Sequence, residues 1–419
     1  MNVVRNSPLA GYYARVFDIR DFGASVGLAD NGPAIQAALN VAVQFGGKVY
    51  IPSGVWPIAT PLLGGANVVL QGDGLASVLS VTSAFPSGQY VYTVNGLATP
   101  VHGVEIRDVH IAVNSVSGVS GLHIQGTYNL ILSNVKIDYF SGYALWLDGT
   151  AGMYGAYSTV DACQFLNGVA ASGGNILTGI RTDRHEHSLV HNCSFAWIGS
   201  SSVGAYGINS TGSANRFINN WFDMVNTPIY VDYAAGNIVQ FNDIDRINGG
   251  SYGITVYGNY ADVSHNHFQT GGQSTPYPTG IRFNTNVTGG VCSGNNFENG
   301  GNWVYAFSGG ATAATDPVLV ADNNFGGYTL GATQNVALRN NYISTMPSSM
   351  APAVPATATL YTNPYPYAYD VYLTGGTVTA VAVNGVTTGF TSGYFFIPPL
   401  GTIELTYSAA PTWVWIAHA

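Results

Sequence analysis

The sequence predicts an all-β protein built around a parallel β-helix of about a dozen rungs. Two recurring columns carry this prediction. A short motif repeats at steps of 18 to 30 residues, and its last residue is always Phe or Ile: Ile111, Ile137, Phe165, Phe195, Phe222, Ile244, Phe268, Phe297, Phe325 and Ile343. Two positions earlier stand Asn220, Asn242, Asn266, Asn295, Asn323 and Asn341. Fixed local patterns at variable spacing are typical of a solenoid that takes up insertions at its corners.

Both columns are interpreted as structural. The Asn column predicts a ladder of side-chain amides, each bonded to the rungs above and below, and the Phe/Ile column predicts a stack in the core. Cys163 and Cys193 occupy the Asn position in earlier repeats, so we expect buried, stacked thiols there rather than redox or metal chemistry. With Cys292 they make three cysteines, which cannot all pair with one another.

Composition excludes several classes of protein. Of 419 residues 47% are hydrophobic, but no apolar run reaches the ~18–20 residues of a membrane span. An aromatic content of 12% argues against disorder. Twelve Lys and Arg against 21 Asp and Glu give a net charge of −9, which argues against binding nucleic-acid phosphates. The first residues contain no apolar core of signal-peptide length.

The chain divides into four predicted segments. Residues 1–47 form an N-terminal segment with a capping helix, which starts near Asp30-Asn31-Gly32-Pro33 and ends at Gly46-Gly47. Such a helix would cover the open end of the solenoid. Residues 48–345 form the β-helix, and the Pro- and Ser-rich residues 346–356 form a linker. Residues 357–419, with turns at Gly375-Gly376 and Asn384-Gly385, predict a small antiparallel β-domain. This segment resembles the C-terminal β-domains of phage fibres and spikes, which implies a role in trimerisation; glycan binding is the alternative.

Three motifs give the sequence a family likeness. VFDIRDFGA (16–24), NGPAIQAALNVAVQFGGKVYIPSGVWPI (31–58) and NVVLQGDG (67–74) resemble the opening of the pectate-lyase-like, single-stranded right-handed β-helix superfamily. Within it the sequence is most similar to phage tailspike polysaccharide depolymerases. The Asp-Pro-His signature of alginate epimerases is absent, as are the paired-Asp and Gly-His-Gly motifs of polygalacturonases. These motifs identify a fold and say less about chemistry.

Strand alternation predicts one exposed face with the composition of a glycan groove. Residues two past a recurring small residue are His123, Trp146, Arg181, Asn209, Tyr230, Thr255 and Arg282, and those four past are Gln125, Asp148, Asp183, Thr211, Asp232, Tyr257 and Asn284. Aromatic rings on this face can stack on sugars beside carboxylates and Arg. We therefore expect substrate-binding roles for Arg181, His185, Trp146, Tyr230, His123 and Arg282. A merely solvated strand face is the alternative.

Asp183 is the first candidate for a catalytic residue. It lies in Arg181–His187, the densest run of ionisable residues, next to insertions at 149–157, 168–178 and 196–206. A corner loop whose charges pair with one another is the structural alternative. Asp148, one rung (~5 Å) away, should have a raised pKa and act as the acid. Asp232, two rungs away, would fit an inverting pair at roughly 9–10 Å. Glu186 is the reserve.

Alternatives to this site and to its chemistry remain open. A β-eliminating lyase would use His185 or Tyr230 as base and Arg181 to neutralise a uronate. A second outward column, Asp138, Asp223, Asp245 and Glu298, is a rival site or a solvated acidic ridge. The spacing of His185, His187 and His191 fits no closed metal site, so neither a metal nor another cofactor is predicted.

The expected function combines these residues with the resemblance. An aliphatic column, Ile131, Leu189, Ile238, Val291 and Leu319, predicts a subunit contact in a homotrimer, unless the insertions fold back over it. The resemblance implies a tailspike-like depolymerase of a bacterial surface polysaccharide, on a virion tail or otherwise extracellular, with hydrolysis favoured over elimination. A non-enzymatic glycan-binding fibre and a secreted bacterial lyase or epimerase are the alternatives.

Overall fold

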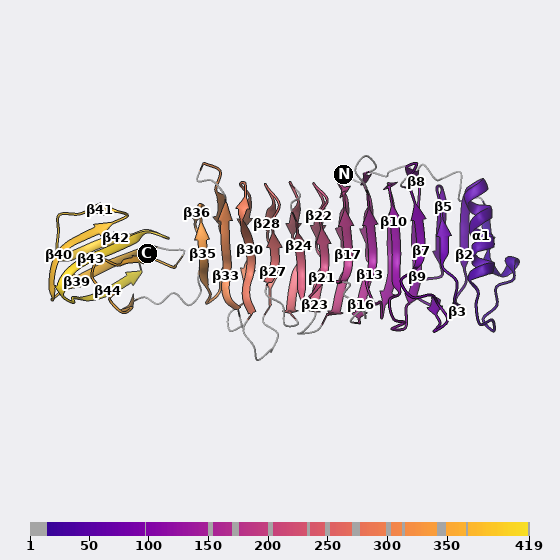
Figure 1. Cartoon of the computed structure of the whole chain (residues 1–419), viewed down its shortest axis with the longest axis horizontal. Coiled ribbons are helices and arrows are strands. Elements are labelled where there is room, and N and C mark those ends of the chain that lie inside the picture. Colours follow the sequence, from indigo (N-terminus) through magenta and orange to yellow (C-terminus); the bar gives the residue numbers. More distant parts are fainter. Residues whose placement is uncertain are drawn as a thin grey trace.

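The computed structural model describes residues 15–417 apart from 97, 150–153, 170–175, 200–203, 233–234, 248–251, 270–276, 299–302, 312–314, 342–348 and 366–367. The predicted parallel β-helix is confirmed: strands stack rung on rung along a long axis, with a small antiparallel domain at one end (Figure 1). None of the described helices is long and apolar enough to cross a membrane.

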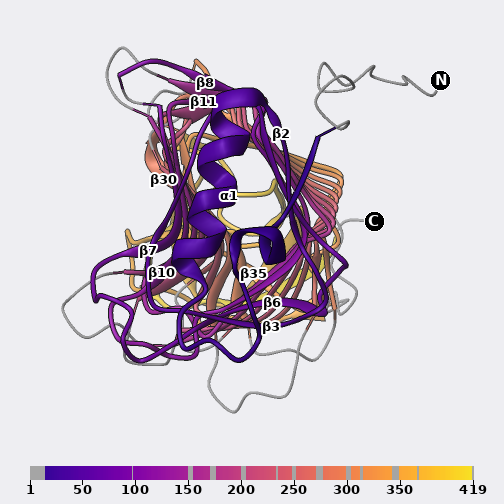
Figure 2. The same ribbon diagram turned by 90° about the vertical axis from the view of Figure 1, so that its right-hand side faces the viewer.

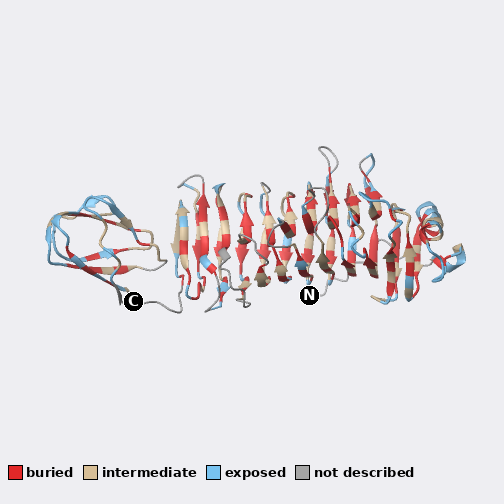
Figure 3. Ribbon diagram, turned by 60° about the horizontal axis from the view of Figure 1, so that its bottom comes forward, coloured by how far each residue is buried: buried red, intermediate tan, exposed pale blue. Residues whose placement is uncertain are grey.

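One face of the β-helix is an eleven-stranded parallel sheet. Its strands are β4 (Leu62–Gly64), β7 (Tyr90–Asn95), β10 (Ser120–Gln125), β13 (Tyr143–Asp148), β17 (Leu177–Asp183), β21 (Ala205–Ser210), β24 (Thr227–Val231), β27 (Tyr252–Val256), β30 (Tyr277–Val287), β33 (Trp303–Ala311) and β35 (Thr329–Gln334). Neighbours in this order are successive rungs, about 4.8 Å apart. Side chains of a strand alternate between its two faces, and the burial colours of Figure 3 change along the strands accordingly.

A 21-stranded sheet bends around the rest of the solenoid. Its strands are β1 (Val16–Asp18), β2 (Gly47–Ile51), β3 (Gly54–Ile58), β5 (Val68–Gly72), β6 (Ser77–Val81), β9 (Glu105–Ala112), β12 (Ile131–Asp138), β15 (Thr159–Asp161), β16 (Gln164–Gly168), β19 (Leu189–His191), β20 (Ser194–Ile198), β22 (Arg216–Ile218), β23 (Trp221–Val225), β25 (Ile238–Gln240), β26 (Asp243–Ile247), β28 (Asp262–Ser264), β29 (His267–Phe268), β31 (Val291–Ser293), β32 (Asn296–Phe297), β34 (Val318–Ala321) and β36 (Val336–Arg339). A short four-stranded sheet fills one corner: β8 (Val101–His102), β11 (Thr127–Tyr128), β14 (Gly155–Ala156) and β18 (His185–Glu186).

The N-terminal end is closed by α1 (Gly32–Phe45), which lies across the opening of the solenoid (Figure 2). Asp30, rather than the N-cap residue Asn31, accepts the helical N–H of Gly32 at 2.8 Å, and its carboxylate also accepts from Ala59 N. The 3-10 helix η1 (Ile19–Phe22) precedes it. Ile35, Ala38 and Leu39 are fully buried against the first rungs, so the helix completes the core there.

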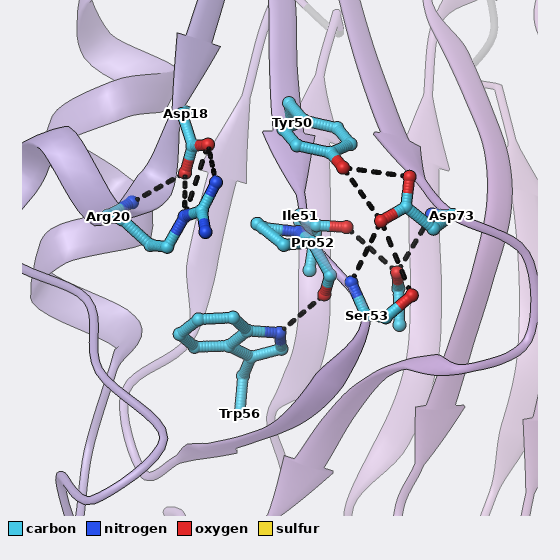
Figure 4. A network of polar contacts seen from close by, with 9 residues as sticks. Asp18, Arg20, Tyr50, Ile51, Pro52, Ser53, Trp56 and Asp73 are labelled. Atoms are coloured by element: carbon cyan, nitrogen blue, oxygen red, sulfur yellow. Dashed lines mark hydrogen bonds and ion pairs between the residues drawn. The ribbon is translucent and has the colours of Figure 1, made fainter.

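The motif residues behind the family likeness build this end of the fold (Figure 4). Asp18 forms an ion pair with Arg20 at 2.6 Å. Asp73 accepts hydrogen bonds from the Tyr50 hydroxyl at 2.7 Å and from Ser53 N at 3.0 Å. The Asp18–Arg20 pair lies at the end of β1, and Asp73 links the end of β5 to β2 and to the turn before β3. These motif residues therefore stabilise the fold, which explains why the motif identifies a fold and says less about chemistry.

The interior follows the two predicted columns. The Phe/Ile column is buried from Ile111 to Phe325, with Phe195 and Phe222 stacked 4.7 Å apart between ring centroids; Ile343 lies outside the described residues. The Asn ladder is confirmed as well. Asn242 Oδ1 accepts from both the backbone N and the Nδ2 of Asn220, each at 3.0 Å, and the pattern repeats rung by rung to Asn341.

The thiols behave as predicted, and a second ladder was missed. Cys163, Cys193 and Cys292 are free and buried, and Cys193 N donates to Asn220 Oδ1 at 3.0 Å. At another corner Asn215 N donates to Asn237 Oδ1 at 3.0 Å. Both of these Asn side chains are fully buried. Buried amides thus satisfy backbone groups at two corners.

The small C-terminal domain has two antiparallel sheets and its own hydrophobic core. One sheet contains β37 (Ser349–Met350), β39 (Tyr369–Thr374), β42 (Gly393–Ile397) and β44 (Thr412–Ala417); the other contains β38 (Leu360–Thr362), β40 (Thr377–Val383), β41 (Val386–Thr387) and β43 (Thr402–Ala409). Strand β37 falls within the segment expected to be a linker and pairs with β44. Strand β1 likewise joins the solenoid from within the predicted N-terminal segment.

Candidate functional site

The exposed side chains of the eleven-stranded sheet stand in the predicted register. His123 pairs with Trp146, Trp146 with Arg181, and Arg181 with Asn209 on successive strands. The column continues through Tyr230 and Thr255 to Arg282. Thr255 is an exception to the expected exposure, because it is only 2% exposed. The sheet therefore brings these predicted site residues onto one face.

Asp183 is held on this face by three side-chain donors. Its Oδ2 accepts from Arg181 Nε at 2.5 Å and from Trp146 Nε1 at 3.0 Å. Its Oδ1 accepts from Thr211 Oγ1 at 3.1 Å. The side chain is still 16% exposed. Three donors from three successive rungs thus fix the orientation of a carboxylate that solvent can reach.

Aromatic rings gather around Trp146, on the N-terminal side of Asp183. The rings of His123 and Trp146 stack with centroids 4.3 Å apart and planes 11° apart. Tyr143 lies 5.2 Å from Trp146 and accepts a hydrogen bond from Arg181 Nη1 at 2.8 Å. The Arg181 guanidinium also lies 5.4 Å from each of the Tyr143 and Trp146 ring centroids. This arrangement is rigid and amphipathic, as a sugar-stacking surface requires.

The expected raised pKa of Asp148 is wrong. Asp148 does lie in register with Asp183 on the adjacent rung. Burial raises the pKa of Asp148, but hydrogen bonds from His123 (3.2 Å) and Gln125 (3.1 Å), the charge of His123 and the backbone N–H of Gly149 outweigh burial, so the pKa is lowered. These bonds stabilise the charged form, and Asp148 is unsuited to donate a proton at neutral pH.

His185 does not belong to the exposed face, contrary to the prediction that it binds substrate. Arg184 adopts a left-handed φ of 48°, and this corner turns His185 into the interior, where it is fully buried. Its Nδ1 lies 3.0 Å from Ser188 Oγ and its Nε2 3.3 Å from Ser158 Oγ. Burial lowers the pKa of His185 to about 4. Glu186 follows on β18, beyond the corner and in a different sheet from Asp183.

A second set of aromatic rings lies on the C-terminal side of Asp183. The rings of Tyr206 and Tyr230 are 5.1 Å apart, and those of Tyr230 and Tyr257 are 5.4 Å apart. Asp232, the last predicted catalytic residue, follows β24 directly. Burial, together with the charges of Asp232 and Tyr257, raises the pKa of Tyr206, which places Asp232 beside this group. Aromatic side chains therefore flank Asp183 and Asp232 on both sides.

Sequence reasoning missed one column of this face. Tyr143, Thr178, Tyr206 and Thr227 are in register on successive strands, and so are Tyr252, Thr279 and Tyr305. Tyr and Thr alternate along the column, which places a phenol ring on every second rung. These residues stand one position before the recurring small residue, so the signal was present in the sequence. Tyr252 and Tyr305 line a cavity of about 350 Å³ together with Arg282.

The rival acidic column differs from its predicted form. A bulge in β26 brings Arg246, not Asp245, opposite Asp223, and the two form a bidentate ion pair with both contacts at 2.6 Å. Asp138 is likewise paired with His110 and Lys136. Burial and the charge of Asp223 raise the pKa of Asp245. Asp138 and Asp223 are therefore buried in internal ion pairs, and they do not form the solvated acidic ridge that was the alternative for this column.

The aliphatic column is interrupted. Ile131, Leu189 and Ile238 alternate with Thr159 and Arg216 on intervening strands, and Asp262 separates Ile238 from Val291. Among the described residues there is no group of three or more His, Cys, Asp or Glu placed to hold a metal ion. Parts of the insertions next to Arg181–His187, at 150–153, 170–175 and 200–203, lie outside the described residues.

Comparisons with known proteins support the fold. Residues 16–220 match the family model described as rhamnogalacturonase A/epimerase, pectate lyase-like. Mannuronan C5-epimerase AlgE3 of Azotobacter vinelandii is 30% identical over 141 residues, which cover 33% of this chain and 7% of that protein. This chain thus spans a small fraction of the curated relative that it matches.

Two solved structures share the architecture along almost the whole chain. A mutant tailspike protein of Escherichia coli bacteriophage HK620, in complex with a hexasaccharide, has a TM-score of 0.61 at 12% identity and covers 96% of this chain and 93% of its own. The tailspike protein gp49 of Acinetobacter baumannii bacteriophage Fri1, a capsular polysaccharide depolymerase, has a TM-score of 0.55 at 13% identity and covers 98% and 86%. Together with the family match over residues 16–220, these likenesses show that the chain has a pectate lyase-like parallel β-helix fold, an architecture also found in phage tailspikes.

Proposed function

We propose that this protein is a tailspike-like depolymerase that cleaves internal glycosidic bonds of a bacterial surface polysaccharide. The observation that carries the proposal is the setting of Asp183. A partly exposed carboxylate, held by Arg181, Trp146 and Thr211, lies between two groups of aromatic rings on one flat sheet. Rings on both sides of a reacting bond can hold sugars on both sides of it, as internal cleavage requires.

Glycoside hydrolysis fits the carboxylates best. Asp183 and Asp232 are two rungs apart, roughly 9–10 Å, near the upper end of the separation in inverting glycosidases. We assign Asp183, ion-paired with Arg181, as the base that activates water, and Asp232 as the acid that protonates the leaving oxygen. Asp148 keeps its charge and orients His123. Trp146 and Tyr230 stack sugar rings on either side.

Elimination or epimerisation of a uronate is the second candidate. Arg181 and Tyr230, two rungs apart in one column of the same face, favour it. A guanidinium can neutralise a uronate carboxylate while a phenol exchanges a proton. His185 takes no part in this candidate, since it is buried. If the aromatic face binds glycan but does not cleave it, the protein would be a non-enzymatic receptor-binding fibre. We place the protein on a virion tail or otherwise outside the cell, assembled as a homotrimer.

A panel of purified bacterial capsules and exopolysaccharides tests the proposal. The full-length protein is incubated with each polysaccharide, and products are analysed by mass spectrometry, by reducing-end assay and by the ultraviolet absorbance of unsaturated uronates. New reducing ends without that absorbance support hydrolysis, and absorbance supports elimination. Tight binding without products from any polysaccharide would identify a binding fibre and overturn the enzymatic proposal.

A further inference from the structure

A cavity opens on the eleven-stranded sheet far from Asp183. It has a volume of about 350 Å³ and is lined by Tyr252 from β27, Arg282 from β30, and Tyr305 and Ser308 from β33. That volume is within the range of small-ligand sites. Arg181 and Arg282 are separated by four rung steps, through β21, β24 and β27 to β30, or ~19 Å. A polysaccharide that follows the face past Asp232 would reach this cavity.

Arg282 has no acidic partner in the part of the chain that the structure describes. Its guanidinium stacks on Tyr252, 4.6 Å from the ring centroid. No described carboxylate lies within ion-pair distance of Arg282, and the residues outside the described part include neither Asp nor Glu. By contrast, Arg181 is bound to Asp183 and Arg246 to Asp223. A partly buried guanidinium without a counter-charge favours an anionic ligand.

The walls of the cavity suit a charged sugar. Stacking on Tyr252 holds the guanidinium plane in one orientation, so its N–H groups are preorganised for a bidentate contact. Ser308 is in register with Arg282 on the next strand and supplies a hydroxyl beside it. Tyr305, 38% exposed, offers a ring for the sugar itself. The cavity thus combines a cation, a hydroxyl and aromatic surface.

We propose that this cavity is a distal subsite for an anionic substituent of the polysaccharide, such as the carboxylate of an acidic sugar. The inference rests on the proposed function, since it assumes that the same glycan lies along the face. If the cavity is such a subsite, the substrate is an acidic polysaccharide that is long enough to reach from Asp183 to Arg282. Short oligosaccharides that end before the cavity would lose this contact and bind more weakly.

The test uses each polysaccharide of the panel in native form and after reduction of its carboxylates to alcohols. Wild type, Arg282→Gln and the control Arg15→Gln are compared; Arg15 is also stacked on a ring, that of Phe45, but at the N-terminal end. We expect Arg282→Gln to raise KM for the native substrate about 10-fold or more, with kcat within about twofold. Reduction of the substrate's carboxylates should raise the KM of the wild-type protein to the same extent. Arg15→Gln should have the wild-type KM for both forms of the substrate.

The outcomes separate the two proposals. If a polysaccharide is cleaved but Arg282→Gln and carboxyl reduction leave KM unchanged, the subsite is wrong while the depolymerase stands. Cleavage of a neutral polysaccharide alone would likewise refute the subsite and leave the depolymerase standing. If no polysaccharide yields products or binds, the proposed function fails, and the subsite fails with it. Circular dichroism of Arg282→Gln shows whether the variant is folded.

Discussion

Trp146 and Asp183 are joined across adjacent rungs by a hydrogen bond of 3.0 Å from the indole Nε1 to the carboxylate Oδ2. Arg181 donates to the same oxygen. The ring expected to stack a sugar therefore also orients the carboxylate expected to react. Binding and chemistry are coupled through one side chain, and its two roles can be separated by substitution.

Replacement of Trp146 should separate them. Trp146→Phe keeps a stacking ring but removes the donor, so kcat should fall several-fold with little change in KM. Trp146→Ala removes both, and KM should rise about 10-fold as well, the scale of losing a stacked aromatic contact. Steady-state kinetics on the cleaved polysaccharide measure both effects. The matched control is Trp221→Ala, a 38% exposed Trp of the 21-stranded sheet, which should leave both constants unchanged.

Asp183→Asn should reduce turnover by about 10²-fold or more, because acid–base assistance is lost. Asn keeps the shape of the side chain, so the midpoint of thermal unfolding should shift little. Product release over time and differential scanning fluorimetry measure the two quantities. Asp245→Asn, on the rival acidic column, is the control. Full activity in Asp183→Asn together with inactive Asp245→Asn would move the site to that column.

Asn266→Ala should destabilise the solenoid by at least about 3 kcal/mol, since several buried partners lose their bonds at once. Asn266 Oδ1 accepts from Asn242 N and Nδ2, and its Nδ2 donates to Val239 O and Asn295 Oδ1, all at 2.9–3.0 Å. Urea unfolding followed by circular dichroism measures the loss. The exposed Asn286 provides the control, and Asn286→Ala should unfold like wild type. Equal stability of the two variants would show that the ladder is not needed.

Buried His185 should make the fold sensitive to acid. Its pKa is about 4 in the fold against about 6.5 when unfolded, so the unfolded state binds the extra proton between these values. Its contribution is complete above pH 6.5 and is lost as the pH falls toward 4, by roughly 3 kcal/mol. His185→Gln should flatten the dependence of Tm on pH in this window. His187→Gln, at an exposed neighbour, should retain the wild-type slope.

The proposed trimer predicts that Ile238→Asp and Leu319→Asp weaken assembly. Each would place a charge where an apolar side chain is expected to meet another subunit, and burial of such a side chain contributes about 1.5–3 kcal/mol. Light scattering of wild type and variants measures the mass. A monomeric wild type would refute the trimer. Arg216, between Leu189 and Ile238 on intervening strands, limits how apolar this contact can be.

Periodic features of the molecule could be predicted from sequence because each rung repeats the same environment. The register of His123, Trp146 and Arg181, and the Asn ladder, follow from column position alone. His185 could not be placed in this way. The alternation counted from Gly179 holds only to the end of β17, and the left-handed residue Arg184 resets it.

The electrostatics of the site were also beyond the sequence pattern. Two carboxylates on adjacent rungs predict mutual repulsion, but the pKa of Asp148 depends on His123 and Gln125, which lie one rung earlier and donate to it. The bulge that brings Arg246 opposite Asp223 is a similar case. Which neighbour meets which depends on one-residue shifts in register that spacing alone does not determine.

The Asn ladder has a polarity along the solenoid. Each Nδ2 from Asn220 to Asn323 donates to the Oδ1 of the next Asn in the column, so the amide dipoles of this run point the same way. Aligned donors and acceptors polarise one another, and the strength of each link then depends on the length of the uninterrupted run. A break in the middle leaves two short runs, whereas a break at Asn341 only shortens one. The loss of stability caused by replacing one Asn should therefore depend on its position in the column, even though the amides from Asn242 to Asn323 make equivalent bonds.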